Sequence, residues 1–163
     1  MRQRVRQFFR AMLVRVSLSE RAIVEGTLSP AQAALFWRMA PCDQRHGLDV
    51  YYALRDGGCQ DEALLVAALL HDVGKAAARL TIVHRVAVVL IERAVPGWLA
   101  RSAGEGKGWK APFAAHLQHP QIGAAWAQAA GSSADIVTLI RQHHASAPRD
   151  ERLIALQEAD KGN

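Results

Sequence analysis

The chain has 163 residues, half of them hydrophobic and 21% charged, which predicts one globular domain and leaves no room for a second of ordinary size. Its two cysteines, Cys42 and Cys59, are too few for a disulfide framework and lack metal-knuckle spacing, which favours a reducing, cytoplasmic location. The net charge of +5 favours an anionic partner, and small phosphates, nucleic acid and acidic membranes all qualify.

Residues 1–16 are predicted to form a basic amphipathic helix. Its arginines and apolar residues alternate as Arg2, Arg4, Val5, Arg6, Phe8, Phe9, Arg10, Met12, Leu13, Arg15 and Val16. The longest apolar run here is Ala11 to Val14, which is too short for a signal peptide. The run around 86–91 is also far too short for a transmembrane span. We expect the basic helix to make a peripheral contact with an anionic membrane or a protein partner.

The remaining segments repeat at a helical period and none alternates like a strand, which predicts an all-α, single-domain helical bundle. Short helices are expected after Ser17, which forms a capping box with Glu20, and after Ser29 with Pro30 at the first helical position. We assign residues 1–40 to N-terminal helices and residues 41–163 to a helical core.

Within the core, a helix over 43–55 is expected to stop at a glycine pair, and a helix over 61–72 is apolar all round and therefore central. Further expected elements are a helix over 83–94, an exposed loop over 102–112, and helices over 120–130, 133–143 and 150 to the end. Because a residue before proline disfavours the helical region, His119 is expected at the mouth of the helix that begins with Pro120.

An adjacent histidine and aspartate, His71 and Asp72, end the central helix. Such groups must be paired or must coordinate an ion, because burying them without partners costs several kcal/mol. The run from Ala67 to Lys75, AALLHDVGK, resembles the HDxGK motif of the HD superfamily. His46 and Asp160 stand where that superfamily has its first histidine and its last aspartate, so the resemblance covers residues 43–160.

The resemblance implies a metal-dependent phosphohydrolase with His46, His71, Asp72 and Asp160 as ligands. Two imidazoles and two carboxylates suit a divalent ion such as Fe, Mn, Co, Ni or Zn. The pair His143-His144, together with His119, is similar to members that hold two metals bridged by the aspartate of the HD pair. The alternatives are that the pair only complements the negative end of a helix dipole, and that His119 is a capping residue.

Lys75 is expected to share a face with His71 and Asp72 on a continuing helical turn. It resembles the motif lysine that binds a substrate phosphate, and with Asp72 it is assigned to catalysis. Arg79, one turn later, is assigned to the same phosphate, and Arg45 is a weaker candidate. The alternative is that Lys75 only complements the helix dipole. His84 and His116 fit no pattern.

The implied reaction is hydrolysis of a phosphoester in a nucleotide or another small phosphorylated molecule by metal-activated water. The stretch after His144 lacks the Gly-Tyr-Pro signature of cyclic-dinucleotide phosphodiesterases. The spacing of 17 residues from His143 to Asp160 is closer to that of small members that cleave dinucleoside polyphosphates. Two alternatives are a two-iron oxygenase and a regulatory module that binds nucleotide without turning it over.

Overall fold

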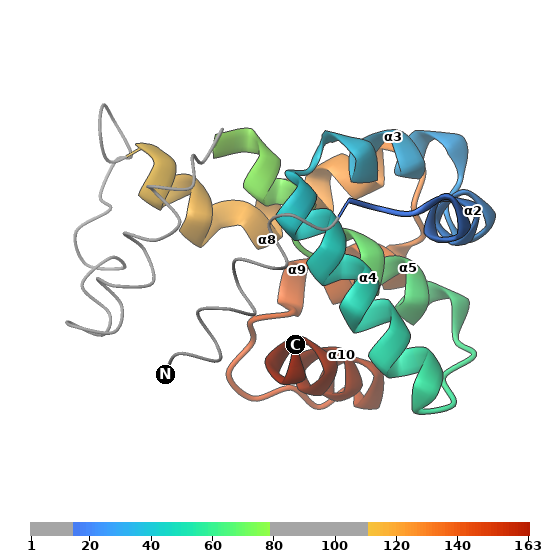
Figure 1. Cartoon of the computed structure of the whole chain (residues 1–163). Coiled ribbons are helices and arrows are strands. Elements are labelled where there is room, and N and C mark those ends of the chain that lie inside the picture. Colours follow the sequence, from blue (N-terminus) through green and yellow to red (C-terminus); the bar gives the residue numbers. More distant parts are fainter. Residues whose placement is uncertain (1–14, 79–110) are drawn as a thin grey trace, which may run out of the picture.

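The structure is a computed structural model that describes residues 15–78 and 111–163, with the side chains of 78 and 111–116 excepted. Within these ranges it contains seven α-helices, one 3-10 helix and no strand, so the predicted all-α bundle is confirmed (Figure 1). The predicted helix over 83–94, Arg79, His84 and most of the basic N-terminal helix lie outside the described residues. The predicted boundary at residue 40 stays a prediction.

The two short N-terminal helices begin where their capping residues predict. Helix α2 (Leu18–Thr27) starts after Ser17, and its capping box with Glu20 is complete. Helix α3 (Pro30–Arg38) starts after Ser29, with a second capping box that was not predicted. Arg15 and Val16 are not helical, so the predicted basic helix does not extend to residue 16. Ser17 takes an extended conformation and caps α2.

The centre of the bundle is formed by helices α4 (Pro41–Asp56) and α5 (Glu62–Leu70). Gly57 ends α4, and Gly58 turns the chain with a φ of 86°. Every residue of α5 from Leu64 to Leu70 is buried, because α5 packs against α2, α3, α4, α9 (Ala134–Gln142) and α10 (Glu151–Gly162). The prediction of a central apolar helix is confirmed, although α5 ends at Leu70 and not at Asp72.

Helix α8 (Ala111–Ala129) differs from its prediction. It runs through Pro120, so His119 lies inside a helix and not at the mouth of one, and residues 111 and 112 are helical and not part of a loop. A proline inside a helix removes a hydrogen bond at a cost of about 3 kcal/mol. Here α8 packs closely along 3-10 helix η1 (Val73–Ala78), and this tertiary packing outweighs the local preference.

The last two helices begin as predicted. The side chain of Ser133 accepts a hydrogen bond from the first turn of α9, and that of Asp150 does the same for α10. At the other end of α10, the Asn163 amide donates to the Ala159 carbonyl oxygen at 2.9 Å and closes the final turn. Among the helices that the structure describes, none is long and apolar enough to cross a membrane.

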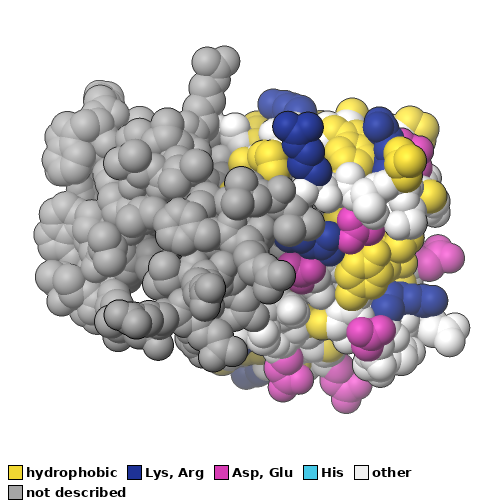
Figure 2. All heavy atoms as spheres, viewed as in Figure 1, with side chains coloured by type: hydrophobic (Ala, Val, Ile, Leu, Met, Phe, Trp, Pro, Cys, Tyr) yellow, Lys and Arg dark blue, Asp and Glu magenta, His cyan; other side chains and the backbone are white. Residues whose placement is uncertain are grey.

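The visible face of the described part carries interspersed acidic, basic and hydrophobic side chains, and no histidine is seen on it (Figure 2). This agrees with the burial of His71, His119 and His143, which rank among the largest fully buried side chains. The polar cluster that the HDxGK run predicts therefore lies inside the bundle.

The glycine of the motif, Gly74, lets η1 and α8 approach each other. A Cβ atom at this position would overlap the His119 carbonyl oxygen and lie 2.8 Å from the backbone nitrogen of Gly123. Both contacts are with backbone, which cannot move aside without shifting α8. The absence of a side chain at Gly74 thus allows the backbone next to Asp72 to lie against the backbone of His119.

We expect Gly74→Ala to lower the free energy of unfolding by at least about 2 kcal/mol, because it overpacks two backbones. Denaturant unfolding of metal-free protein checks this. The matched control is Gly26→Ala in α2, where a Cβ meets nothing within 4 Å and the gain in helix propensity makes the change neutral or stabilising. Equal stability of the two variants would contradict the close approach.

Candidate metal centre

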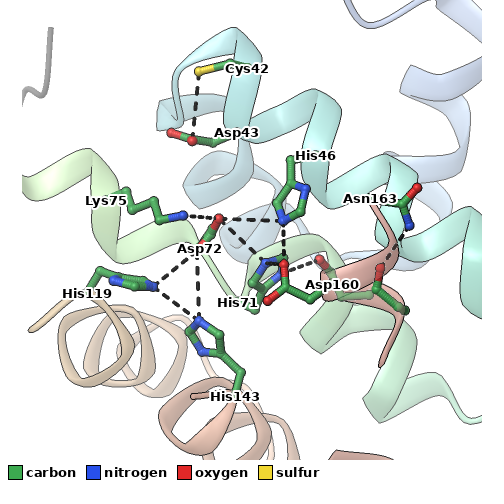
Figure 3. Close-up of polar contacts among 12 residues, drawn as sticks. Cys42, Asp43, His46, His71, Asp72, Lys75, His119, His143, Asp160 and Asn163 are labelled. Atoms are coloured by element: carbon green, nitrogen blue, oxygen red, sulfur yellow. Dashed lines mark hydrogen bonds and ion pairs between the residues drawn. The ribbon is translucent and has the colours of Figure 1, made fainter. Parts of the chain in front are cut away.

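The carboxylate of Asp72 lies between two groups of histidines, and each of its oxygens faces one group (Figure 3). Oδ2 is 3.9 Å from His46 Nε2 and 3.6 Å from His71 Nε2. Oδ1 is 3.2 Å from His119 Nε2 and 3.9 Å from His143 Nε2. Asp72 is only 3% exposed, so these side chains and not water surround its charge.

The first cluster consists of His46 from α4, His71 from the end of α5 and Asp160 from the last turn of α10. Their ligand atoms all lie within 4.8 Å of one another. His46 Nε2 and Asp160 Oδ1 are 2.8 Å apart and form a hydrogen bond. Burial alone would raise the pKa of the Asp160 carboxyl, but His46 and His71 lower it to about 2. The carboxylate is therefore ionised, as a metal ligand must be.

The second cluster consists of His119 from α8 with His143 and His144, and its ligand atoms also lie within 4.8 Å of one another. Helix α9 ends at Gln142, so the two adjacent histidines lie beyond the regular helix and can reach one point. The Nε2 atoms of His119 and His143 are 3.2 Å apart. Two nitrogens bound to one ion at about 2.1 Å lie roughly 3.0 to 3.4 Å apart at ordinary coordination angles. The cluster therefore fits a single ion.

Backbone hydrogen bonds orient two of the buried imidazoles toward Asp72. The Nδ1 atom of His71 lies 2.9 Å from the Ala68 carbonyl oxygen, and Nδ1 of His143 lies 2.7 Å from that of Ile140. A carbonyl only accepts, so each Nδ1 carries the proton and each Nε2 presents a lone pair to the site. This arrangement is typical of histidines that bind metal through Nε2.

The protonation states of these histidines also fit metal binding. Burial lowers the pKa of His71 below its ordinary value, and burial, with the His71 ring beside it, lowers the pKa of His143 to about 3. Both rings are thus neutral at pH 7. His71 Nε2 is buried and has no hydrogen-bond partner among the described residues, which is costly unless a cation occupies that position.

Lys75 forms a direct ion pair with Asp72, with Nζ 2.5 Å from Oδ2. Burial alone would raise the pKa of Asp72, but Lys75 and the nearby His71 and His119 hold it well below its ordinary value. Burial alone would lower the pKa of Lys75, and Asp72 and Asp43 raise it instead. The expectation that Lys75 lies beside Asp72 is confirmed, and the ion pair itself was not predicted.

The structure thus brings together all seven side chains that the sequence assigns to metal, and Lys75 with them: His46, His71, Asp72, His119, His143, His144 and Asp160. Arg79, the other assigned phosphate contact, lies outside the described residues. Arg45 is not directed to the site. Its guanidinium is buried against Glu20 at 2.5 Å and Asp49 at 2.9 Å, where it joins α4 to α2.

Sequence reasoning missed a cavity of about 630 Å³ beside the second cluster. His119 and His144 form part of its wall, together with Arg141 and Gln142 from the end of α9. Arg141 lies two residues before the paired histidines, so its place in the sequence offered a cue. The cations considered from the sequence were those near the HDxGK run, so Arg141 was not predicted.

The family model for the HD domain matches residues 46–161, which is well over half of the chain. The chain belongs to the HD domain family, whose members are metal-dependent, hydrolase-like proteins. No curated protein and no solved structure matches the chain at a significant level. The family therefore supports a site for divalent metal in the two clusters, and the assignment to members with a paired histidine stays a prediction.

One prediction concerns the Lys75 ion pair. In metal-free protein, Lys75→Met should lower the free energy of unfolding by about 1 to 3 kcal/mol, because the Asp72 carboxylate stays buried with one cation fewer. Saturating Mn²⁺ should reduce the deficit, since a divalent ion supplies the missing positive charge. Urea unfolding with chelator and with Mn²⁺ measures both effects. Lys161→Met, at an exposed position in α10, is the control. If Lys75→Met lost no more stability than this control, the stabilising role of the ion pair would be contradicted.

A second prediction concerns metal stoichiometry. With two clusters that share Asp72, we expect close to two ions per chain in protein isolated without chelator. His143→Ala should reduce this toward one by removing a ligand of the second cluster, and His46→Ala should do so through the first. Elemental analysis of the purified variants provides the count. A value of one under saturating metal, unchanged by His143→Ala, would mean a mononuclear site.

Proposed function

We propose that the chain is a metal-dependent phosphohydrolase that acts on a small phosphoester, with a nucleotide as the expected substrate class. The observation that carries the proposal is the division of Asp72 between two ligand clusters, with a protonated lysine on the same carboxylate. A site for two cations with an additional ammonium group suits the two or more negative charges of a phosphate ester.

In this proposal, Asp72 would be shared by two divalent ions, such as Fe, Mn, Co, Ni or Zn. His46, His71 and Asp160 would hold the first ion, and His119, His143 and His144 would hold the second. When bound, such ions supply Lewis acidity and lower the pKa of water from about 15.7 to about 7, so that it can attack phosphorus at neutral pH.

The protein residues provide orientation and charge. The backbone bonds from Nδ1 of His71 and His143 hold the imidazole rings in place before substrate arrives, so that little reorganisation is needed during reaction. The Lys75 ammonium can neutralise charge on a phosphoryl oxygen through a charge-assisted hydrogen bond. Its ion pair with Asp72 fixes the position from which it acts.

The exposed side chain of His144 and the cavity beside it favour the second cluster as the side from which substrate enters. In the first cluster, a hydrogen bond joins Asp160 and His46 across the ligand position. The phosphoryl group would then approach Asp72 from the side of its Oδ1 atom.

The test is phosphate release from a panel of nucleotides with Mn, Co, Ni or Fe added. Asp72→Asn keeps the shape of the side chain and removes the shared charge, so we expect at least about a 100-fold loss of activity together with loss of bound metal. Asp135→Asn, at an exposed carboxylate in α9, should leave both unchanged.

Two outcomes of the same assay would reject the proposal in favour of its alternatives. Oxygen consumption by iron-loaded protein without phosphate release would indicate a two-iron oxygenase. Nucleotide binding without turnover under any metal would indicate a regulatory module.

A further inference from the structure

The cavity beside the second cluster has the size of a small-molecule site. Its volume is about 630 Å³, and pockets that enclose small ligands commonly measure about 300 to 1,000 Å³. His119 and His144, both assigned to metal, form part of its wall. A substrate whose phosphoryl group lies at the clusters would therefore place its remaining atoms in this cavity.

Three groups on the polar wall of the cavity form no ion pair or side-chain hydrogen bond with any described residue. Arg141 forms no ion pair within the described ranges, although other arginines there, such as Arg45 and Arg152, are paired with carboxylates. The side-chain amides of Gln121 and Gln142 make no hydrogen bond with any described residue. A guanidinium presents several fixed donors that match a phosphate with two parallel hydrogen bonds.

The apolar wall is formed in part by Leu117 and Pro120 of α8. Leu117 is 41% exposed, one of the few large hydrophobic side chains in the described ranges with that exposure. A cavity that combines an apolar surface with a few convergent polar groups is the usual form of a site for an organic ligand. The cavity thus suits a molecule with an organic part and a charged part.

Lys75 and Arg141 carry their positive charges at different places in the site. Lys75 contacts Oδ2 of Asp72 and does not line the cavity, whereas Arg141 lines the cavity and has no contact with Asp72. A phosphoryl group bound at the clusters leaves the charge of Arg141 available. The spare charge is complementary to a second anionic group on the same substrate.

We infer that this cavity is a second substrate subsite in which Arg141 binds an anionic group distinct from the one that is hydrolysed. The inference rests on the proposed function and narrows its substrate class to small molecules with at least two phosphate groups, such as nucleoside diphosphates, in preference to monophosphates. Arg141 is then a specificity-determining residue, with Gln121 and Gln142 as neighbouring hydrogen-bonding groups.

The experiment measures equilibrium binding in the absence of turnover. Isothermal titration of Mn²⁺-loaded protein compares α,β-methylene-ADP, whose P–C–P bridge resists hydrolysis, with the phosphonate analogue of AMP. We expect the wild type to bind the first at least about tenfold more tightly, and Arg141→Gln to remove most of that preference at unchanged metal content. Arg141→Lys should keep part of the preference, because it retains the charge without the fork of donors.

The control variant is Arg55→Gln, which removes the same charge from an exposed arginine of α4 that does not line the cavity. It should keep the wild-type preference. The inference is overturned if the wild type binds both analogues equally, or if Arg141→Gln weakens both by the same factor, which would place Arg141 on the reacting phosphate. An Arg141-dependent preference without any hydrolysis would support the subsite and reject the phosphohydrolase proposal.

Discussion

Burying the Asp72 carboxylate costs several kcal/mol of lost hydration, and the groups around it have to offset that cost. Among the described residues, Lys75 makes the shortest ionic contact with Asp72, at 2.5 Å, and imidazoles from the two clusters surround the rest of the carboxylate. Helices far apart in the sequence must meet at one point to do this. The close contact at Gly74 and the central position of α5 follow from the same requirement.

Local chemistry explains why much of the fold could be predicted. The capping residues Ser17, Ser29 and Ser133 act within three residues of themselves, so the helix starts they mark could be read directly. The apolar run of α5 likewise predicted its burial. The site residues followed from the order of histidines and aspartates in the HD family pattern, and their convergence in space agrees with that order.

Features that depend on contacts between distant residues could not be predicted. The continuation of α8 through Pro120 depends on its packing against η1, and the local rule for a residue before proline gave the wrong position for His119. Arg45 was considered for phosphate binding because it precedes His46 in the sequence. Its guanidinium instead pairs with Glu20, 25 residues away. The cavity at Arg141 exists only once α8 and α9 are packed together.

The C-terminal ends of three helices add negative charge to the surroundings of the site. Helices α5, α9 and α10 end at Leu70, Gln142 and Gly162, so His71, His143 and Asp160 all lie at C-terminal ends. Each such end carries roughly half a negative charge from its aligned peptide dipoles. The backbone alone thus creates a potential that attracts cations and repels anions. Under the proposed function, metal ions would therefore bind first and reverse the local potential before an anionic phosphate approaches.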